Sequence, residues 1–113
     1  MTERQFQGGV EQLLRLYGWR YYHTHDSRRS SAGFPDLCAV RGSRLVFIEL
    51  KTETGRVSDE QKAWLADLEN AGVEAYVWRP SDLEHASRIL AARQRLDVDW
   101  IGALNAERIR GAS

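Results

Sequence analysis

Apolar residues recur at helical spacing in the first part of the chain. They share one face of a helix, because positions three or four apart lie one above the other. These residues are Phe6, Val10, Leu13, Leu14 and Tyr17. Gly18 follows them, and glycine commonly ends a helix. The pattern predicts a helix over residues 3–17, although Gly8 and Gly9 weaken it by roughly 1 kcal/mol each.

Four short segments rich in aliphatic and aromatic residues predict strands. They are residues 19–24, 36–41, 44–51 and 73–78. Only Gly42 and Ser43 separate the second segment from the third, and a two-residue link that begins with glycine is typical of a hairpin with a type II′ turn. We therefore expect these two strands to pair antiparallel.

Two capping boxes predict the later helices. In this motif a serine hydroxyl and a glutamine or glutamate three residues later bond reciprocally to backbone N–H groups. The two pairs are Ser58 with Gln61 and Ser81 with Glu84. The first predicts a helix from Ser58 to just before Gly72, and the second predicts a helix over residues 82–93. The element order is then α-β-β-β-α-β-α, with a right-handed parallel crossover around the middle helix.

The predicted hairpin brings two carboxylates together. Counting back from the turn places Asp36 opposite Glu49, and directly opposed residues have Cβ atoms about 5 Å apart. Lys51 lies two positions beyond Glu49, on the same face. Opposed carboxylates repel each other unless a cation lies between them, and Mg²⁺ prefers oxygen ligands of this kind. The register predicts a divalent-metal site, provided that no bulge turns one side chain to the other face.

Each of these residues also has a purely structural explanation. An aspartate before a strand is commonly a turn residue, and a Glu-x-Lys pair is commonly a solvated strand face. The combination favours a site, because Glu49 and Lys51 interrupt a run that is otherwise apolar on both faces. Charges at the end of a buried strand need partners.

A set of motifs in fixed order resembles a known family. The motifs are Tyr22-His23-Thr24, Ser27-Arg28-Arg29-Ser30, Gly33-Phe34-Pro35-Asp36-Leu37, Glu49-Leu50-Lys51-Thr52-Glu53, Ser58-x-x-Gln61 and Tyr76-Val77-Trp78-Arg79-Pro80. Pro-Asp followed by Glu-x-Lys resembles the PD-(D/E)XK nuclease signature, and the fuller set is similar to stand-alone VRR-NUC proteins. The resemblance implies an α/β, restriction-endonuclease-like core with a mixed central sheet flanked by helices. It implies a domain over residues 1–93, with 94–113 as an extension in which 98–109 is expected to form a short helix.

The resemblance also implies roles for individual residues. Asp36 and Glu49 would bind the metal with the backbone carbonyl of Leu50, and Lys51 would orient water or stabilise developing charge. A carboxylate from the first helix is expected as well. Glu3 lies at the edge of the apolar stripe of that helix and Glu11 points away from it, so Glu3 is the candidate.

Two further groups complete the predicted site. Gln61 would take part in the active site in addition to its capping role. Ser27, Arg28 and Arg29 precede the metal-binding strand, where the arginines would contact DNA phosphates. A zinc site at His25 and Asp26 is disfavoured, because no further ligands follow at zinc-site spacing.

Composition limits the partners of the chain. It has 113 residues, which is a common length for one domain, and its formal net charge is zero. Any nucleic-acid contact must therefore come from a local patch. The single cysteine, Cys38, excludes an intramolecular disulfide and a zinc site of several cysteines. No apolar stretch reaches the roughly 18 residues of a spanning helix, so we expect a cytoplasmic protein with no membrane partner.

The resemblance implies a structure-specific DNA endonuclease that uses Mg²⁺ or Mn²⁺ and no small-molecule cofactor. Its expected substrate is branched DNA, as for a Holliday junction resolvase. Cutting two strands symmetrically requires two sites, so a homodimer is expected. The alternative is a non-catalytic or partner-dependent nucleic-acid-binding module with the same fold.

Overall fold

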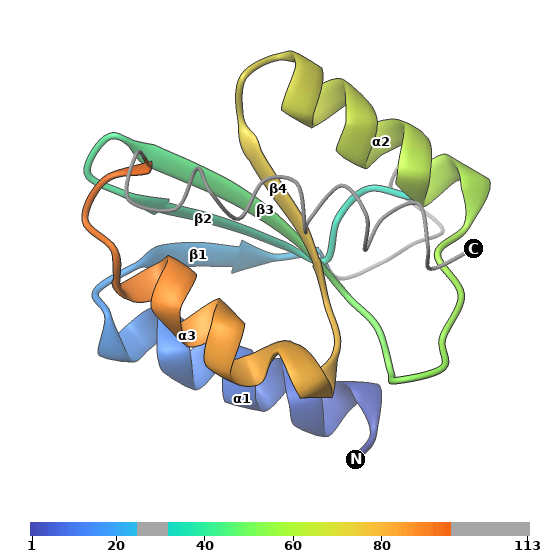
Figure 1. The fold of residues 1–113 in the computed structure, drawn as a ribbon, viewed down its shortest axis with the longest axis horizontal. Helices are drawn as coiled ribbons and strands as arrows, with labels where there is room; N and C mark the ends of the chain where they lie inside the picture. The colour runs from blue at the N-terminus through green and yellow to red at the C-terminus, as the bar shows by residue number, and fades with distance from the viewer. Residues whose placement is uncertain (25–31, 96–113) are drawn as a thin grey trace.

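A computed structural model describes residues 1–24 and 32–95 of the chain. The elements are α1 (Glu3–Leu16), β1 (Arg20–His23), β2 (Leu37–Arg41), β3 (Arg44–Leu50), α2 (Asp59–Asn70), β4 (Glu74–Trp78), the 3₁₀ turn η1 (Pro80–Asp82) and α3 (Leu83–Ala91) (Figure 1). This order confirms the prediction, with η1 added. Among the described helices, none combines the length and the apolar character needed to cross a membrane.

The four strands form one mixed sheet in the order β1-β2-β3-β4. β2 pairs antiparallel with both β1 and β3, whereas β3 pairs parallel with β4. Helices α1 and α3 lie side by side on one face of the sheet, and α2 lies on the other face (Figure 1). The predicted α/β, restriction-endonuclease-like architecture is confirmed.

The hairpin between β2 and β3 has the predicted register. Val40 pairs with Leu45 and Cys38 with Phe47, without a bulge between β2 and β3. Gly42 has φ +58°, the value that the first central position of a type II′ turn requires. The two-residue link therefore fixes which side chains of β2 and β3 share a face.

The main core fills the space between the sheet and the helices α1 and α3. Its largest fully buried members are Trp78, Phe6, Leu14, Leu37, Ile48 and Leu50. A smaller core lies under α2 and contains Val57, Leu65, Ala75 and Val77. Because strand side chains alternate, residues next to Leu37 and Ile48 in sequence point toward the face that carries α2.

A buried ion pair ties β3 to β4 and to the end of α3. The side chains of Arg44 and Glu74 form a bidentate contact with N–O distances of 2.6 and 2.9 Å. Arg44 Nη1 also donates to the carbonyls of Ile89 and Ala92, and its guanidinium lies 4.9 Å from the centroid of the Trp19 ring. These contacts fix the strand that carries Glu49 within the sheet.

The two predicted capping boxes have different outcomes. Ser58 Oγ accepts from the N–H of Gln61, and Gln61 Oε1 accepts from the N–H of Ser58, which confirms the first box. The second is wrong. Ser81 instead donates its N–H and its hydroxyl to the carboxylate of Glu53, and the chain passes through η1 before α3 begins at Leu83.

Candidate active site

Asp36 and Glu49 lie on neighbouring strands at the end of the hairpin that is remote from the turn. Asp36 immediately precedes β2, whose first residue Leu37 pairs with Ile48, so the next pair along the register is Asp36 with Glu49. Asp36 Oδ2 accepts a 2.8 Å hydrogen bond from the backbone N–H of Leu50. The two carboxylates therefore share the sheet face that carries α2, as the register predicted.

Glu49 is almost fully buried, with 2% of its surface exposed. Its Oε2 accepts a 2.9 Å hydrogen bond from Gln61 Nε2 and lies 3.8 Å from Lys51 Nζ. Its Oε1 is buried and has no hydrogen-bond partner among the described residues. A buried carboxylate oxygen without a donor is costly, so this atom is suited to a ligand that the polypeptide does not supply.

The pKa of Glu49 is raised to about 8, first by burial and then by the negative charge of Asp36, whereas Lys51 opposes the shift. Burial also raises the pKa of Asp36, although the Leu50 N–H and the charges of Lys51 and His23 act in the opposite direction. Two carboxylates this close together, one buried and one half-buried, do not both ionise easily. A divalent cation between them would favour the doubly ionised form.

The two carboxylates offer oxygen ligands, which hard divalent cations prefer. Within residues 1–24 and 32–95 no three His, Cys, Asp or Glu side chains lie close enough to hold one ion. Two carboxylates would therefore be completed by water, substrate oxygens and a backbone carbonyl, which is the usual environment of Mg²⁺. The carbonyl of Leu50 remains the predicted backbone ligand.

The acids of α1 have separate environments. The charge of Glu3 contributes to the raised pKa of Glu49, which places Glu3 on the side of the site. Glu11 instead accepts hydrogen bonds of 2.8 Å from Gln7 and from the hydroxyl of Tyr21. The structure thus favours Glu3 over Glu11 as the acid near the site, and its role as a metal ligand remains a prediction.

Residues 11–82 match the profile of the family described as the VRR-NUC domain. The match spans more than half of the chain. This protein belongs to the VRR-NUC domain family. The matched segment includes Asp36, Glu49, Lys51 and Gln61, whereas Glu3 precedes it.

Two further proteins are similar to parts of this chain, one in sequence and one in fold. A Fanconi-associated nuclease 1 homolog of Schizosaccharomyces pombe is 38% identical over 56 residues, which are 48% of this chain and only 8% of that protein. The Holliday junction resolvase Hjc of Archaeoglobus fulgidus superposes with a TM-score of 0.54 at 23% identity, over 68% of this chain and 69% of Hjc. The second likeness establishes the fold.

The loop before Asp36 packs against the start of α2 in this VRR-NUC chain. Gly33 has φ +84°, and a Cβ at this position would lie 2.5 Å from the carbonyl carbon of Glu60. The Phe34 ring contacts the rings of Phe47 and Trp64 edge to face, with centroids 5.9 and 5.0 Å away. These contacts set the distance between the strand end that carries Asp36 and the helix that carries Gln61.

The loop after Lys51 is held by an arginine whose role was not predicted from the sequence. Arg79 Nη1 donates to the carbonyls of Thr52 and Gly55 at 2.6 and 2.7 Å. Arg79 belongs to one of the quoted motifs, but its partners lie about 25 positions earlier in the chain. Their proximity follows from the parallel pairing of β3 with β4.

Ser27, Arg28 and Arg29, the predicted DNA-binding residues, lie outside the described residues. His23 contributes a charge that lowers the pKa of Asp36, an effect not anticipated from the sequence. The structure therefore brings Asp36, Glu49, Lys51 and Gln61 together and places Glu3 nearby.

Proposed function

We propose that this VRR-NUC chain is a divalent-metal-dependent endonuclease that hydrolyses phosphodiester bonds in branched DNA. The observation that carries the proposal is the pair of neighbouring carboxylates, half-buried Asp36 and buried Glu49, with Oε1 of Glu49 left without a donor among the described residues. Family membership supports nuclease chemistry, and the resolvase fold supports a DNA substrate. Mg²⁺ and Mn²⁺ are the proposed ions.

Hydrolysis adds a water oxygen to phosphorus and breaks one ester P–O bond, and the leaving oxygen takes up a proton. A bound divalent ion would polarise the phosphate and lower the pKa of the attacking water. Asp36 and Glu49 would hold that ion. The Lys51 ammonium, 3.8 Å from Glu49 Oε2, is placed to donate to the phosphate or to the attacking water. Gln61 would fix the orientation of the Glu49 carboxylate through their hydrogen bond.

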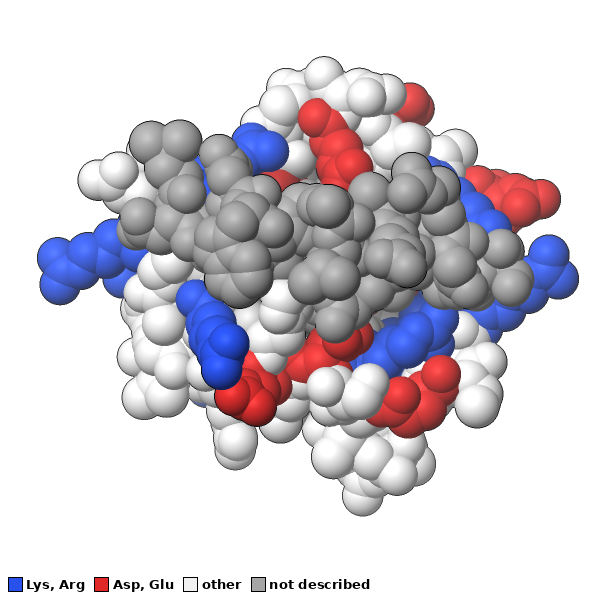
Figure 2. Space-filling view, in the orientation of Figure 1, with Lys and Arg blue, Asp and Glu red and all other residues white. Residues whose placement is uncertain are grey.

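Charge distribution argues for local rather than global DNA attraction. The net charge is zero. Figure 2 shows basic and acidic side chains together on the same face of the molecule. Binding would then depend on residues at the site and on the predicted contacts of Arg28 and Arg29. Because one site cuts one strand, symmetric cleavage of a four-way junction would require a homodimer.

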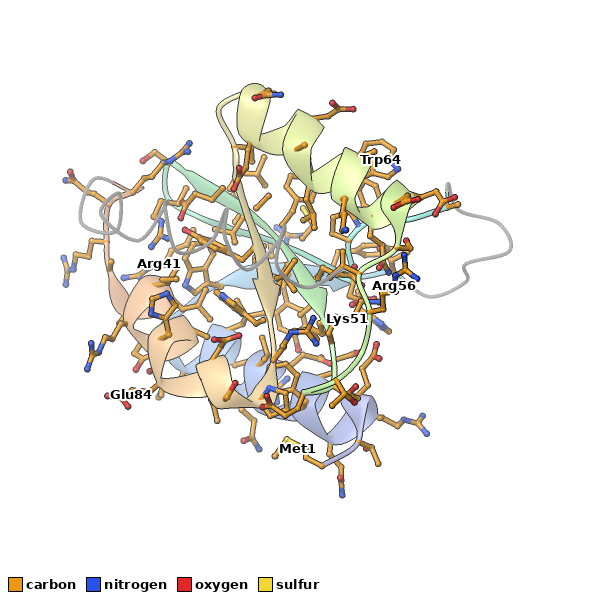
Figure 3. All side chains as sticks on the ribbon, turned by 45° about the vertical axis from the view of Figure 1, so that its right-hand side comes forward. Met1, Arg41, Lys51, Arg56, Trp64 and Glu84 are labelled. Atoms are coloured by element: carbon orange, nitrogen blue, oxygen red, sulfur yellow. The ribbon has the colours of Figure 1, made fainter. Side chains whose placement is uncertain are left out.

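The test is a cleavage panel at fixed salt. Single-stranded, duplex, flap, fork and four-way DNA are incubated with the full chain and Mg²⁺ or Mn²⁺, with EDTA as a blank. We expect cleavage of branched substrates that EDTA stops and that Asp36→Asn, Glu49→Gln and Lys51→Met each reduce by at least about 100-fold. Glu84→Gln is the control, because Glu84 is exposed on α3 and bonds only to Arg88 in the described part (Figure 3).

Calorimetric titration with Mn²⁺ separates the enzyme from a binding module. Wild type should bind Mn²⁺, and Asp36→Asn should not. DNA binding with neither Mn²⁺ binding nor cleavage would instead identify a non-catalytic module. Cleavage that survives in both Asp36→Asn and Glu49→Gln would reject the site.

A further inference from the structure

Arg56 is an exposed arginine on a fixed segment of backbone. Its side chain makes no hydrogen bond or ion pair with any other described residue. Gly55 precedes it, with its carbonyl bound by Arg79 at 2.7 Å, and Val57 follows it, fully buried in the core under α2. The guanidinium is therefore presented from a backbone that is anchored on both sides.

The same loop places Arg56 beside the candidate active site. The turn from Thr52 to Gly55 closes with a 3.3 Å hydrogen bond, which brings the chain back over Lys51. A Cβ at Gly55 would lie 3.6 Å from Lys51 Cδ, so the backbone next to Arg56 lies close to the Lys51 side chain. Figure 3 shows Lys51 and Arg56 on the same side of the molecule.

The geometry points to Arg56 as a DNA-binding residue that contacts the backbone phosphate next to the scissile one. This inference rests on the proposed function and adds a substrate contact to it. A guanidinium binds a phosphate bidentately through two parallel N–H donors, which a lysine cannot do. Arg79 already holds the loop, so DNA binding would order only the Arg56 side chain. Little of the binding free energy would then be offset by a loss of backbone entropy.

The acids that precede Arg56 in this segment are engaged or buried, whereas Asp59 and Glu60 follow it in the first turn of α2. Glu53, the acid of this loop, is engaged by the N–H and hydroxyl of Ser81, with the N–H contact at 2.5 Å. Glu49 is buried. Arg56 is thus a charged group of the loop with no partner among the described residues, and a phosphodiester is the partner that the neighbouring site would present.

The test is the salt dependence of DNA binding, measured by fluorescence anisotropy with a labelled four-way junction in EDTA, so that no cleavage occurs. Each phosphate contact contributes about one to the slope of log K against log salt. We expect Arg56→Gln to lower that slope by about one and to weaken binding roughly tenfold at low salt. Arg56→Lys should keep the slope, because it keeps the charge.

Arg20→Gln is the matched control. Arg20 is also an exposed arginine, but it pairs with Val40 at the opposite end of β1 from His23, away from Asp36. The slope of log K against log salt for Arg20→Gln should equal that of wild type. Thermal unfolding of each variant shows whether it is folded. If Arg56→Gln lowers the slope of log K against log salt and keeps the thermal midpoint of wild type, a structural cause is excluded.

The two proposals fail in different ways. If wild type cleaves branched DNA and Arg56→Gln has the slope of wild type, the role of Arg56 is rejected and the endonuclease stands. An equal loss of slope in Arg20→Gln also rejects it, because the effect would then be one of overall charge. If wild type cleaves none of the substrates, the endonuclease itself is rejected.

Discussion

Gln61 Nε2 donates a 2.9 Å hydrogen bond to Glu49 Oε2, and this contact joins the first turn of α2 to the end of β3. The same Gln61 side chain uses its Oε1 to accept from the N–H of Ser58. One amide group therefore completes the helix cap with its oxygen and holds the buried carboxylate with its nitrogen. A glutamate would cap equally well but could not donate to Glu49.

Because the amide oxygen and the amide nitrogen of Gln61 have separate roles, two substitutions of this residue should have distinct effects. Gln61→Glu should preserve the helix cap and lower cleavage at least tenfold, because a carboxylate cannot donate to the ionised Glu49 and repels it. Gln61→Ala should lower cleavage and also the free energy of unfolding, by about 1–2 kcal/mol. Urea unfolding and single-turnover cleavage measure the two effects.

The matched control is Gln5, which occupies the same position in the capping box that Thr2 begins in α1. Gln5→Ala should cost about 0.5–1 kcal/mol and leave cleavage intact. Equal cleavage by wild type and Gln61→Glu would contradict the role of the Gln61 amide at Glu49.

The raised pKa of Glu49 predicts how stability depends on pH. Since the folded state holds this proton up to pH about 8 and the unfolded state releases it near 4.5, folding takes up a proton between these values. The free energy of unfolding of the metal-free protein should therefore fall as pH rises through this window. In Glu49→Gln the fall should be smaller. Urea titrations in EDTA at several pH values measure it.

Metal should reverse this trend, because only the ionised carboxylates bind it. With saturating Mn²⁺ the free energy of unfolding should rise toward pH 8, and calorimetry in buffers of different ionisation enthalpy should detect proton release on binding. A fall in stability with pH that is equal in wild type and Glu49→Gln would show that another group causes it.

Gly33 predicts a second effect on the site. Gly33→Ala would place a methyl 2.5 Å from the backbone of Glu60 and force φ +84° on an alanine, so the loop and α2 must separate. We expect a loss of roughly 2–4 kcal/mol in the free energy of unfolding and weaker Mn²⁺ binding. Thermal unfolding and calorimetry measure these effects.

Gly8 provides the comparison. It is exposed within α1, and a Cβ there meets no atom within 4 Å. Gly8→Ala should stabilise the protein by about 0.5–1 kcal/mol, because alanine loses less backbone entropy in a helix. Destabilisation by Gly8→Ala, or none by Gly33→Ala, would contradict the packing described.

The buried pair of Arg44 and Glu74 predicts a stability effect that does not depend on function. Arg44→Met would leave Glu74 buried with the Tyr76 hydroxyl as its side-chain donor among the described residues, at a cost of about 3–5 kcal/mol. Arg41→Met removes one hydrogen bond, to the carbonyl of Leu90, and should cost about 1 kcal/mol. Denaturant unfolding distinguishes these magnitudes.

The double variant Arg44→Met with Glu74→Met tests the cause. Replacing both charges by apolar side chains removes the unpaired carboxylate, so it should recover part of the loss. A double variant less stable than Arg44→Met alone would show that the loss is one of packing rather than of an unpaired charge.

The placement of Asp36 beside Glu49 could be predicted because it depends on a count of residues. A two-residue turn fixes the antiparallel register, and the alternation of strand side chains carries that register to the strand ends. The cap of α2 was equally predictable, since Ser58 and Gln61 are three residues apart and meet within one helical turn.

The capping box expected at Ser81 was wrong for a tertiary reason. The carboxylate of Glu53, which is 28 positions away, takes both donors of Ser81. A local motif predicts a contact only if no distant group competes for the same donors. The Arg79 contacts with the loop after Lys51 likewise depend on β4 lying next to β3.

The sequence by itself determined the order of the elements, the hairpin register and hence the neighbouring carboxylates, because each depends on geometry that repeats along the backbone at a fixed period. Only the tertiary structure decided that Gln61 reaches Glu49 and that Arg79 fixes the loop that presents Arg56. Those contacts depend on how helices and strands pack against one another. Packing distances are set by side chains from the whole chain, so no local spacing encodes them.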